Sequence, residues 1–141
     1  MKLRSQYALM ALLLCAAPYA IMQAAGDLIE ATSLQHLQSI IAQHDNIVVD
    51  FYATWCGPCQ RMGPVFAQLP GAFQNQNIIF VKINVDLAGS TYGVRMLPTI
   101  VYFARDAKDN TVKEIYRTSG FKQFNVLSQD VKNTYKNLFS N

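Results

Sequence analysis

The sequence predicts an α/β domain that follows a short N-terminal segment. Short runs rich in β-branched and aromatic residues alternate with longer stretches in which apolar residues recur at helical spacing. The chain has 141 residues, about the length of one domain, and no internal repeat or low-complexity linker divides it. Apolar residues make up 51% of the chain, which is enough to build a buried core and excludes a disordered chain.

Helical spacing predicts three helices in the domain. Thr32 or Ser33 suits the N-cap of the first, which should end near Asp45-Asn46. A second helix should begin near Cys56 and run past Leu69. The third carries an apolar stripe to the C-terminus, made of Phe121, Phe124, Leu127, Val131, Tyr135 and Leu138.

Three short runs rich in β-branched or aromatic residues, 47–52, 78–85 and 99–103, predict strands. A further strand is expected over 112–117. The last two flank the turn-like Lys108-Asp109-Asn110, so we expect 99–117 to form an antiparallel hairpin that Gly120 ends. The formal charge is only +3 and no two Lys or Arg residues are adjacent, so a nucleic-acid partner is not expected.

Residues 1–25 have the pattern of an export signal, which leaves 26–141 as the domain. Lys2 and Arg4 precede an uninterrupted apolar run, 7–17, and Pro18 follows it. A cleaved signal peptide is the favoured interpretation. An uncleaved membrane anchor through 7–25 and a lipid-modified Cys15 are the alternatives. All three place the domain outside the cytoplasm, in the periplasm or cell envelope.

Loss of Cys15 with a cleaved signal would leave two thiols, Cys56 and Cys59, in the mature chain. Their C-x-x-C spacing brings two sulfurs close enough to bond. At the start of a helix, backbone N–H groups and the positive end of the helix dipole stabilise a Cys56 thiolate, which becomes a nucleophile. Gly57-Pro58 suits the tight turn between them. Cys59, one turn further on, can then attack the mixed disulfide that Cys56 forms.

A C-x-x-C pair could instead be half of a zinc site. The only histidines are His36 and His44, eight residues apart on one predicted helix, about 12 Å and too far for one tetrahedral ion. We therefore expect no metal and no cofactor. A purely structural disulfide is also a weak explanation, because a loop this short constrains little chain entropy.

The segment VDFYATWCGPC, residues 49–59, resembles the active-site strand and turn of thioredoxins, and YGVRMLPT, residues 92–99, resembles the family's second hallmark segment. The order of elements from about Asp27 is similar to the thioredoxin fold, so the resemblance implies a central mixed β-sheet flanked by helices. It also implies a protein-disulfide oxidoreductase that acts on protein disulfides.

The resemblance assigns roles to four further positions. Asp50 would accept the proton of Cys59, and its burial should raise its pKa; Lys82 would tune Asp50. Trp55 would cover the active-site turn, and Pro98 would be cis and hold substrate. Each has a plainer alternative: a solvent-facing strand end for Asp50, a solvated strand lysine for Lys82, a surface aromatic for Trp55 and an ordinary strand-start proline for Pro98.

The resemblance also assigns a rim that docks partners, made of Met96-Leu97 and Ser119-Gly120. Met96 replaces a residue that is commonly small in the family. Pro70-Gly71 falls where the family's second helix continues, so that helix should kink or end early. The stretch between Asp86 and Tyr92 is short, and the hairpin turn between Arg105 and Lys113 is longer than usual.

Gly57-Pro58 between the cysteines resembles the reducing members of the family. The favoured hypothesis is therefore an exported, monomeric reductant that receives electrons from a membrane protein. The alternatives are a disulfide oxidant or isomerase of the same fold, and a docking module in which redox activity is secondary.

Overall fold

The computed structural model describes residues 26–140. The predicted signal or anchor, 1–25, lies outside the described residues. The strands are β1 (Leu28–Ala31), β2 (Asn46–Tyr52), β3 (Ile79–Asn84), β4 (Thr99–Arg105) and β5 (Val112–Ser119). The helices are α1 (Leu34–Gln43), α2 (Gly57–Phe66), α3 (Leu69–Ala72), α4 (Val85–Ala88) and α5 (Phe124–Thr134), and a 3₁₀ turn, Lys136–Leu138, follows them.

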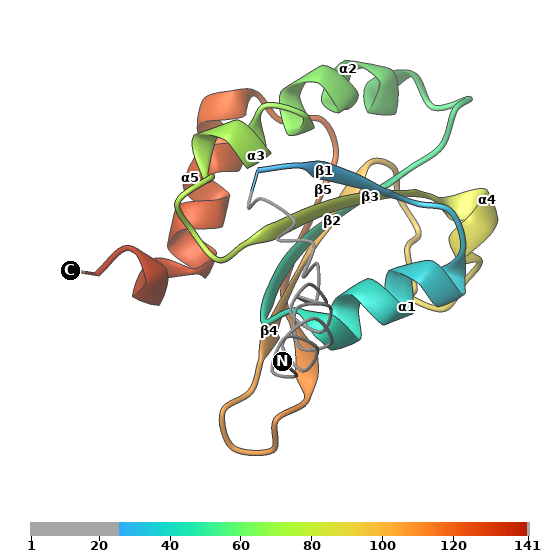
Figure 1. Cartoon of the computed structure of the whole chain (residues 1–141). Helices are drawn as coiled ribbons and strands as arrows, with labels where there is room; N and C mark the ends of the chain where they lie inside the picture. Colours follow the sequence, from blue (N-terminus) through green and yellow to red (C-terminus); the bar gives the residue numbers. More distant parts are fainter. Residues whose placement is uncertain (1–25, 141) are drawn as a thin grey trace, which may run out of the picture.

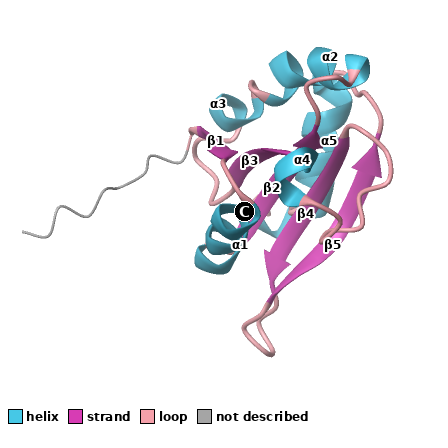
Figure 2. Cartoon of the chain, turned by 90° about the vertical axis from the view of Figure 1, so that its right-hand side faces the viewer, coloured by secondary structure: helices cyan, strands magenta, loops and turns pink. Residues whose placement is uncertain are grey.

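The five strands form one mixed sheet in the order β1-β3-β2-β4-β5. β1, β3 and β2 run parallel, whereas β4 and β5 are antiparallel to their neighbours. Helices cover both faces: α2, α3 and α5 lie on one side of the sheet, and α1 and α4 lie on the other (Figures 1 and 2). The predicted central mixed β-sheet flanked by helices is therefore confirmed.

Two cores, one on each face of the sheet, share β2 because successive side chains of a strand point to opposite faces. Val48 packs with Met62 and Phe66 of α2 and with Leu127 of α5. The alternate residue Val49 packs on the other face with Leu37 of α1. Each large side chain that is fully buried contributes about 1.5–3 kcal/mol of hydrophobic stabilisation. Because β2 is packed on both faces, its side chains are restricted by their neighbours along most of the strand.

Ser33 is the N-cap of α1, and its hydroxyl accepts the His36 N–H across 3.0 Å. The predicted hairpin is also present as β4 and β5, and Asn110 in its turn has a φ of 58°. Gly120, just past β5, has a φ of 87°, which glycine adopts without steric cost.

The second helix ends earlier than predicted. α2 stops at Phe66, and Leu69 starts a separate short helix. Pro70 has no N–H to donate to the Phe66 carbonyl, so the helical hydrogen bonds cannot continue through it. The second helix therefore ends early, as expected, but the break falls at Ala67-Gln68, and Pro70-Gly71 lie inside α3. The expectation that one helix runs past Leu69 is wrong.

The C-terminal helix starts later than its apolar stripe suggests, because α5 begins at Phe124 and Phe121 lies in the preceding loop. The guanidinium of Arg61, from α2, lies over the Phe121 ring at 5.5 Å from its centroid. This contact gives Phe121 a packing partner, although Phe121 lies outside the helix. The spacing of residues also missed β1 and α4, each of only four residues.

Candidate active site

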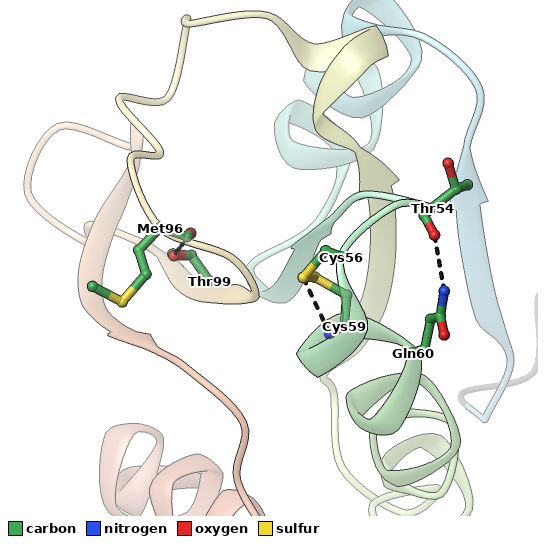
Figure 3. The surroundings of a disulfide bond; sticks show 6 residues. All are labelled: Thr54, Cys56, Cys59, Gln60, Met96 and Thr99. Atoms are coloured by element: carbon green, nitrogen blue, oxygen red, sulfur yellow. Dashed lines mark hydrogen bonds between the residues drawn. A yellow bond between two sulfur atoms is a disulfide. The ribbon is translucent and has the colours of Figure 1, made fainter.

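Cys56 and Cys59 are joined by a disulfide where the loop after β2 enters α2 (Figure 3). Their Cα atoms are 5.2 Å apart, within the range that a disulfide spans. The loop is fastened to the helix, because Nε2 of Gln60 donates to the carbonyl of Thr54 across 3.1 Å. Because this loop directly follows β2, both sulfurs lie just beyond the end of that strand.

Cys56 is the N-cap residue of α2, and its Sγ accepts the backbone N–H of Cys59 across 3.2 Å. Pro58 occupies the first turn, where its missing N–H leaves no donor unpaired. α2 has ten residues, long enough to direct a positive dipole end at the sulfur. In the reduced protein the same N–H and dipole would stabilise a negative charge on Cys56.

Cys56 lines an open cleft of about 510 Å³ between the active-site turn and the segment before β4. Trp55 and Pro58 form one wall of the cleft, and Val94 and Leu97 form the other. Trp55 is 70% exposed and borders the cleft. Met96, next to Leu97, is 61% exposed. The cleft therefore presents apolar side chains to solvent beside a buried sulfur, a combination typical of an interaction site.

The Leu97–Pro98 peptide bond is cis. Hydrogen bonds hold this segment: the hydroxyl of Thr99 donates to the carbonyl of Met96 across 2.6 Å and lies 2.8 Å from the Ser119 hydroxyl. The N–H of Gly120 donates to the carbonyl of Pro98 across 2.8 Å. Both predicted halves of the rim, 96–97 and 119–120, are thus connected through Pro98 and Thr99. Figure 3 shows Met96 and Thr99 on one side of the disulfide, with Thr54 and Gln60 on the opposite side.

Asp50 is buried in the middle of β2 with 1% of its surface exposed, which excludes the solvent-facing alternative. Its Oδ1 has no hydrogen-bond partner within residues 26–140. Loss of solvent raises the pKa of Asp50 to about 7, despite the opposing attraction of Lys82. A second cleft, of about 290 Å³, is lined by Asp50, Cys59 and Lys82, so the carboxyl shares a cavity with the inner cysteine.

Lys82 lies opposite Asp50 in the register of β2 and β3. Its Nζ forms an ion pair with Glu30, 2.8 Å from Oε2, and lies over the ring of Tyr52 at 5.1 Å. The hydroxyl of Tyr52 donates to the other Glu30 oxygen across 2.7 Å. The side chain of Lys82 is about one-third exposed, so it is only partly solvated.

Sequence reasoning missed three residues that adjoin the site, namely Glu30, Tyr52 and Thr99. Thr99 is the last residue of the hallmark segment 92–99, but its hydrogen bond to Met96 was not predicted. Tyr52 lies inside the active-site motif, two positions after Asp50 and hence on the same face of β2. Glu30 belongs to the strand that was not predicted, so nothing placed it beside Lys82.

Within residues 26–140, no group of three His, Cys, Asp or Glu side chains is placed to hold a metal ion. In the same range, none of the helices has the length and apolar character that crossing a membrane requires.

Residues 28–131 match the thioredoxin family model. The chain is 36% identical over 95 residues to the thioredoxin of Mycoplasma pneumoniae, which covers 65% of this chain and 85% of that protein. It is 40% identical over 80 residues to thioredoxin-like protein 1 of Schizosaccharomyces pombe, covering 55% of this chain but only 28% of that longer protein. Among solved structures, Schistosoma mansoni thioredoxin superposes with a TM-score of 0.65 at 28% identity, over 78% of this chain and 97% of that one.

Proposed function

The chain belongs to the thioredoxin family of protein-disulfide oxidoreductases, and on that basis we propose that it reduces protein disulfides outside the cytoplasm. The observation that carries the proposal is the Cys56–Cys59 disulfide at the N-terminus of α2, with its inner sulfur in the same cleft as Asp50. Gly57-Pro58 between the cysteines supports the reducing direction by its resemblance to reducing members of the family.

In the first step, the Cys56 thiolate attacks one sulfur of a substrate disulfide that has docked in the apolar cleft. A Cys56–substrate disulfide forms, the substrate's own S–S bond breaks, and the leaving thiolate takes a proton from water. Leu97 of the rim lines the cleft that contains Cys56 and would border the bound substrate, with the exposed Met96 beside it.

In the second step, Cys59 resolves the mixed disulfide. Asp50 takes the Cys59 proton, the Cys59 sulfur attacks Sγ of Cys56, and the second substrate thiolate leaves. Two electrons have then moved to the substrate, and the protein is left with the disulfide seen in Figure 3. An acceptor whose pKa is about 7 suits this transfer, since it can both take and return a proton near neutral pH.

A reductant outside the cytoplasm needs a source of electrons. We propose a membrane protein with a reactive dithiol, which would return two electrons and two protons to the Cys56–Cys59 disulfide after each cycle. The signal-like residues 1–25 support export, either as a cleaved signal or as an anchor through 7–25. One chain supplies both walls of the cleft, which supports action as a monomer.

Reduction of insulin in the presence of dithiothreitol tests the chemistry. We expect the wild-type protein to accelerate precipitation of the insulin B chain, Cys56→Ser to abolish the acceleration, and Cys59→Ser to accumulate a mixed disulfide with insulin. Glu114→Gln, which alters an exposed ion pair on β5, is the matched control and should retain full activity. Equal rates for wild type and Cys56→Ser would refute the enzymatic proposal.

The reduction potential tests the direction of electron flow. A value near −270 mV supports a reductant, whereas a value near −120 mV would identify an oxidant instead. Fractionation of the cells that produce the protein, followed by N-terminal sequencing of the mature chain, tests export. A cytoplasmic protein that retains Met1 would contradict it.

A further inference from the structure

Three charged residues form a row across the sheet. Glu30 of β1 pairs in register with Lys82 of β3, and Lys82 pairs in register with Asp50 of β2. Registered residues of adjacent parallel strands point to the same face. An acid, a base and a second acid therefore lie side by side, with the lysine in the middle.

The lysine is bound on only one side of this row. Its Nζ lies 2.8 Å from Oε2 of Glu30 and 5.1 Å from the centre of the Tyr52 ring. Tyr52 also donates to Oε1 of Glu30 across 2.7 Å, so both carboxylate oxygens are engaged. No hydrogen bond joins Lys82 to Asp50, whose Oδ1 has no partner within the described chain.

Few other groups act on Asp50. Cys59 faces the shared cleft from α2, Tyr52 lies on the same strand, and β4 places uncharged Ile100 opposite Asp50. Within the described residues, the charges that act on the Asp50 carboxyl are Lys82, which attracts its ionised form, and Glu30, which repels it. Control of Asp50 by charge therefore depends on where Glu30 holds Lys82.

We propose that Glu30 is a positioning residue for thiol–disulfide exchange, because its ion pair holds the Lys82 ammonium out of hydrogen-bond contact with Asp50 and leaves the buried Asp50 carboxyl free to exchange a proton with Cys59. The inference rests on the proposed role of Asp50 as proton acceptor. If Lys82 were released, its flexible stem could bring the ammonium against Asp50, and an opposite charge at contact distance stabilises the ionised carboxylate. A carboxylate held in an ion pair accepts a proton less readily.

The titration of Asp50 in the oxidised protein tests this directly, because the disulfide removes both thiols from the titration. We would follow the ¹³Cγ resonance of Asp50 by NMR. Glu30→Gln retains a hydrogen-bond acceptor for Tyr52 but removes the charge, so the midpoint should fall by about one pH unit. Lys82→Gln should raise it. Glu114→Gln, which loses an exposed carboxylate on the distant strand β5, should leave it unchanged.

A double-mutant cycle separates an effect through Lys82 from direct repulsion between Glu30 and Asp50. In the Lys82→Gln background, Glu30→Gln should produce a much smaller shift than it does alone. An unchanged Asp50 midpoint in Glu30→Gln, or the same shift with and without Lys82, would overturn the positioning role.

Kinetics of the resolving step distinguish this inference from the proposed function. The pH midpoint for release of substrate from the mixed disulfide should move down in Glu30→Gln together with the NMR midpoint. If Asp50→Asn leaves the resolving rate unchanged, the role of Asp50 fails, whatever the titrations give. If Asp50→Asn slows resolution and Glu30→Gln moves neither midpoint, only the inference about Glu30 fails.

Discussion

Asp50 of β2 and Cys59 of α2 line the same cleft, although each comes from a different layer of the molecule. Asp50 is almost fully buried and Cys59 is 4% exposed, so bulk water has little access to either. Gln60 and Lys82 also line this cleft. Proton transfer between the two groups can therefore proceed within a restricted space, directly or through one water molecule.

Asp50→Asn should slow the resolving attack by Cys59 more than the first attack by Cys56. The amide cannot accept a proton, whereas Cys56 depends on the helix N-terminus. General-base contributions suggest a loss of about 100-fold in the resolving rate at neutral pH. Stopped-flow measurement of both steps with a disulfide substrate checks this. A larger effect on the first attack would refute the assignment.

The same burial makes stability depend on pH. The pKa of Asp50 is raised from 3.8 to about 7 on folding. Between these values the folded protein binds more protons than the unfolded chain, so the free energy of unfolding should fall as pH rises from about 4 to 7 and then level off.

Asp50→Asn should remove most of this pH dependence. Above pH 7 the oxidised variant should be more stable than wild type by about 2–4 kcal/mol, because it no longer buries a charge. Urea denaturation at several pH values measures the difference, with Asp27→Asn, at an exposed position, as control. Equal stability at pH 8 would show that the folded protein solvates the Asp50 carboxylate.

Arg105 at the end of β4 fastens α1 to the sheet. Its Nε donates to Oδ1 of Asp45 across 2.7 Å, and its Nη2 donates to the carbonyls of Ala42 and His44. Arg105→Ala should therefore lower the free energy of unfolding by about 1–3 kcal/mol, since these carbonyls lose their partner. Denaturant titration beside Arg95→Ala, an exposed arginine, measures the loss. Equal effects would mean that the hydrogen bonds of Arg105 add nothing.

Tyr135, after α5, sends its hydroxyl into the sheet. The hydroxyl lies 2.8 Å from the carbonyl of Ile47 and 2.9 Å from that of Phe103, two residues paired across β2 and β4. Tyr135→Phe should cost about 1–2 kcal/mol of stability, because buried carbonyl oxygens lose a donor. Tyr116→Phe, at an exposed tyrosine, should cost little. Thermal unfolding of both variants measures these losses of stability. Equal losses would show that the Tyr135 hydroxyl does not stabilise the sheet.

The strands buried on both faces were predictable from sequence, because short and mostly apolar runs such as 47–52 are typical of them. β1 was not, since its four residues are mostly half-exposed and it is held by backbone pairing to β3. α4 was not predicted because its first residue, Val85, continues the apolar run of the preceding strand. Phe121 was assigned to a helix because its spacing fits α5, while its actual partner, Arg61, comes from a distant part of the chain.

The active-site sulfurs were predictable because C-x-x-C is a local pattern, and the position of Asp50 follows from its place in a buried strand. Glu30 was not predictable. Its proximity to Lys82 depends on the register of two strands whose paired residues are 52 positions apart in the sequence, which no local spacing reveals.

The proposed mechanism requires Cys56 to be an acidic nucleophile at the start of α2. The direct measurement is the rate at which Cys56 in the reduced protein reacts with iodoacetamide as pH varies, followed by peptide mass spectrometry so that each cysteine is resolved. We predict that the midpoint of this profile lies below that of free cysteine, about 8.5, and that Cys59 reacts far more slowly. A Cys56 midpoint at or above that of free cysteine would contradict the account.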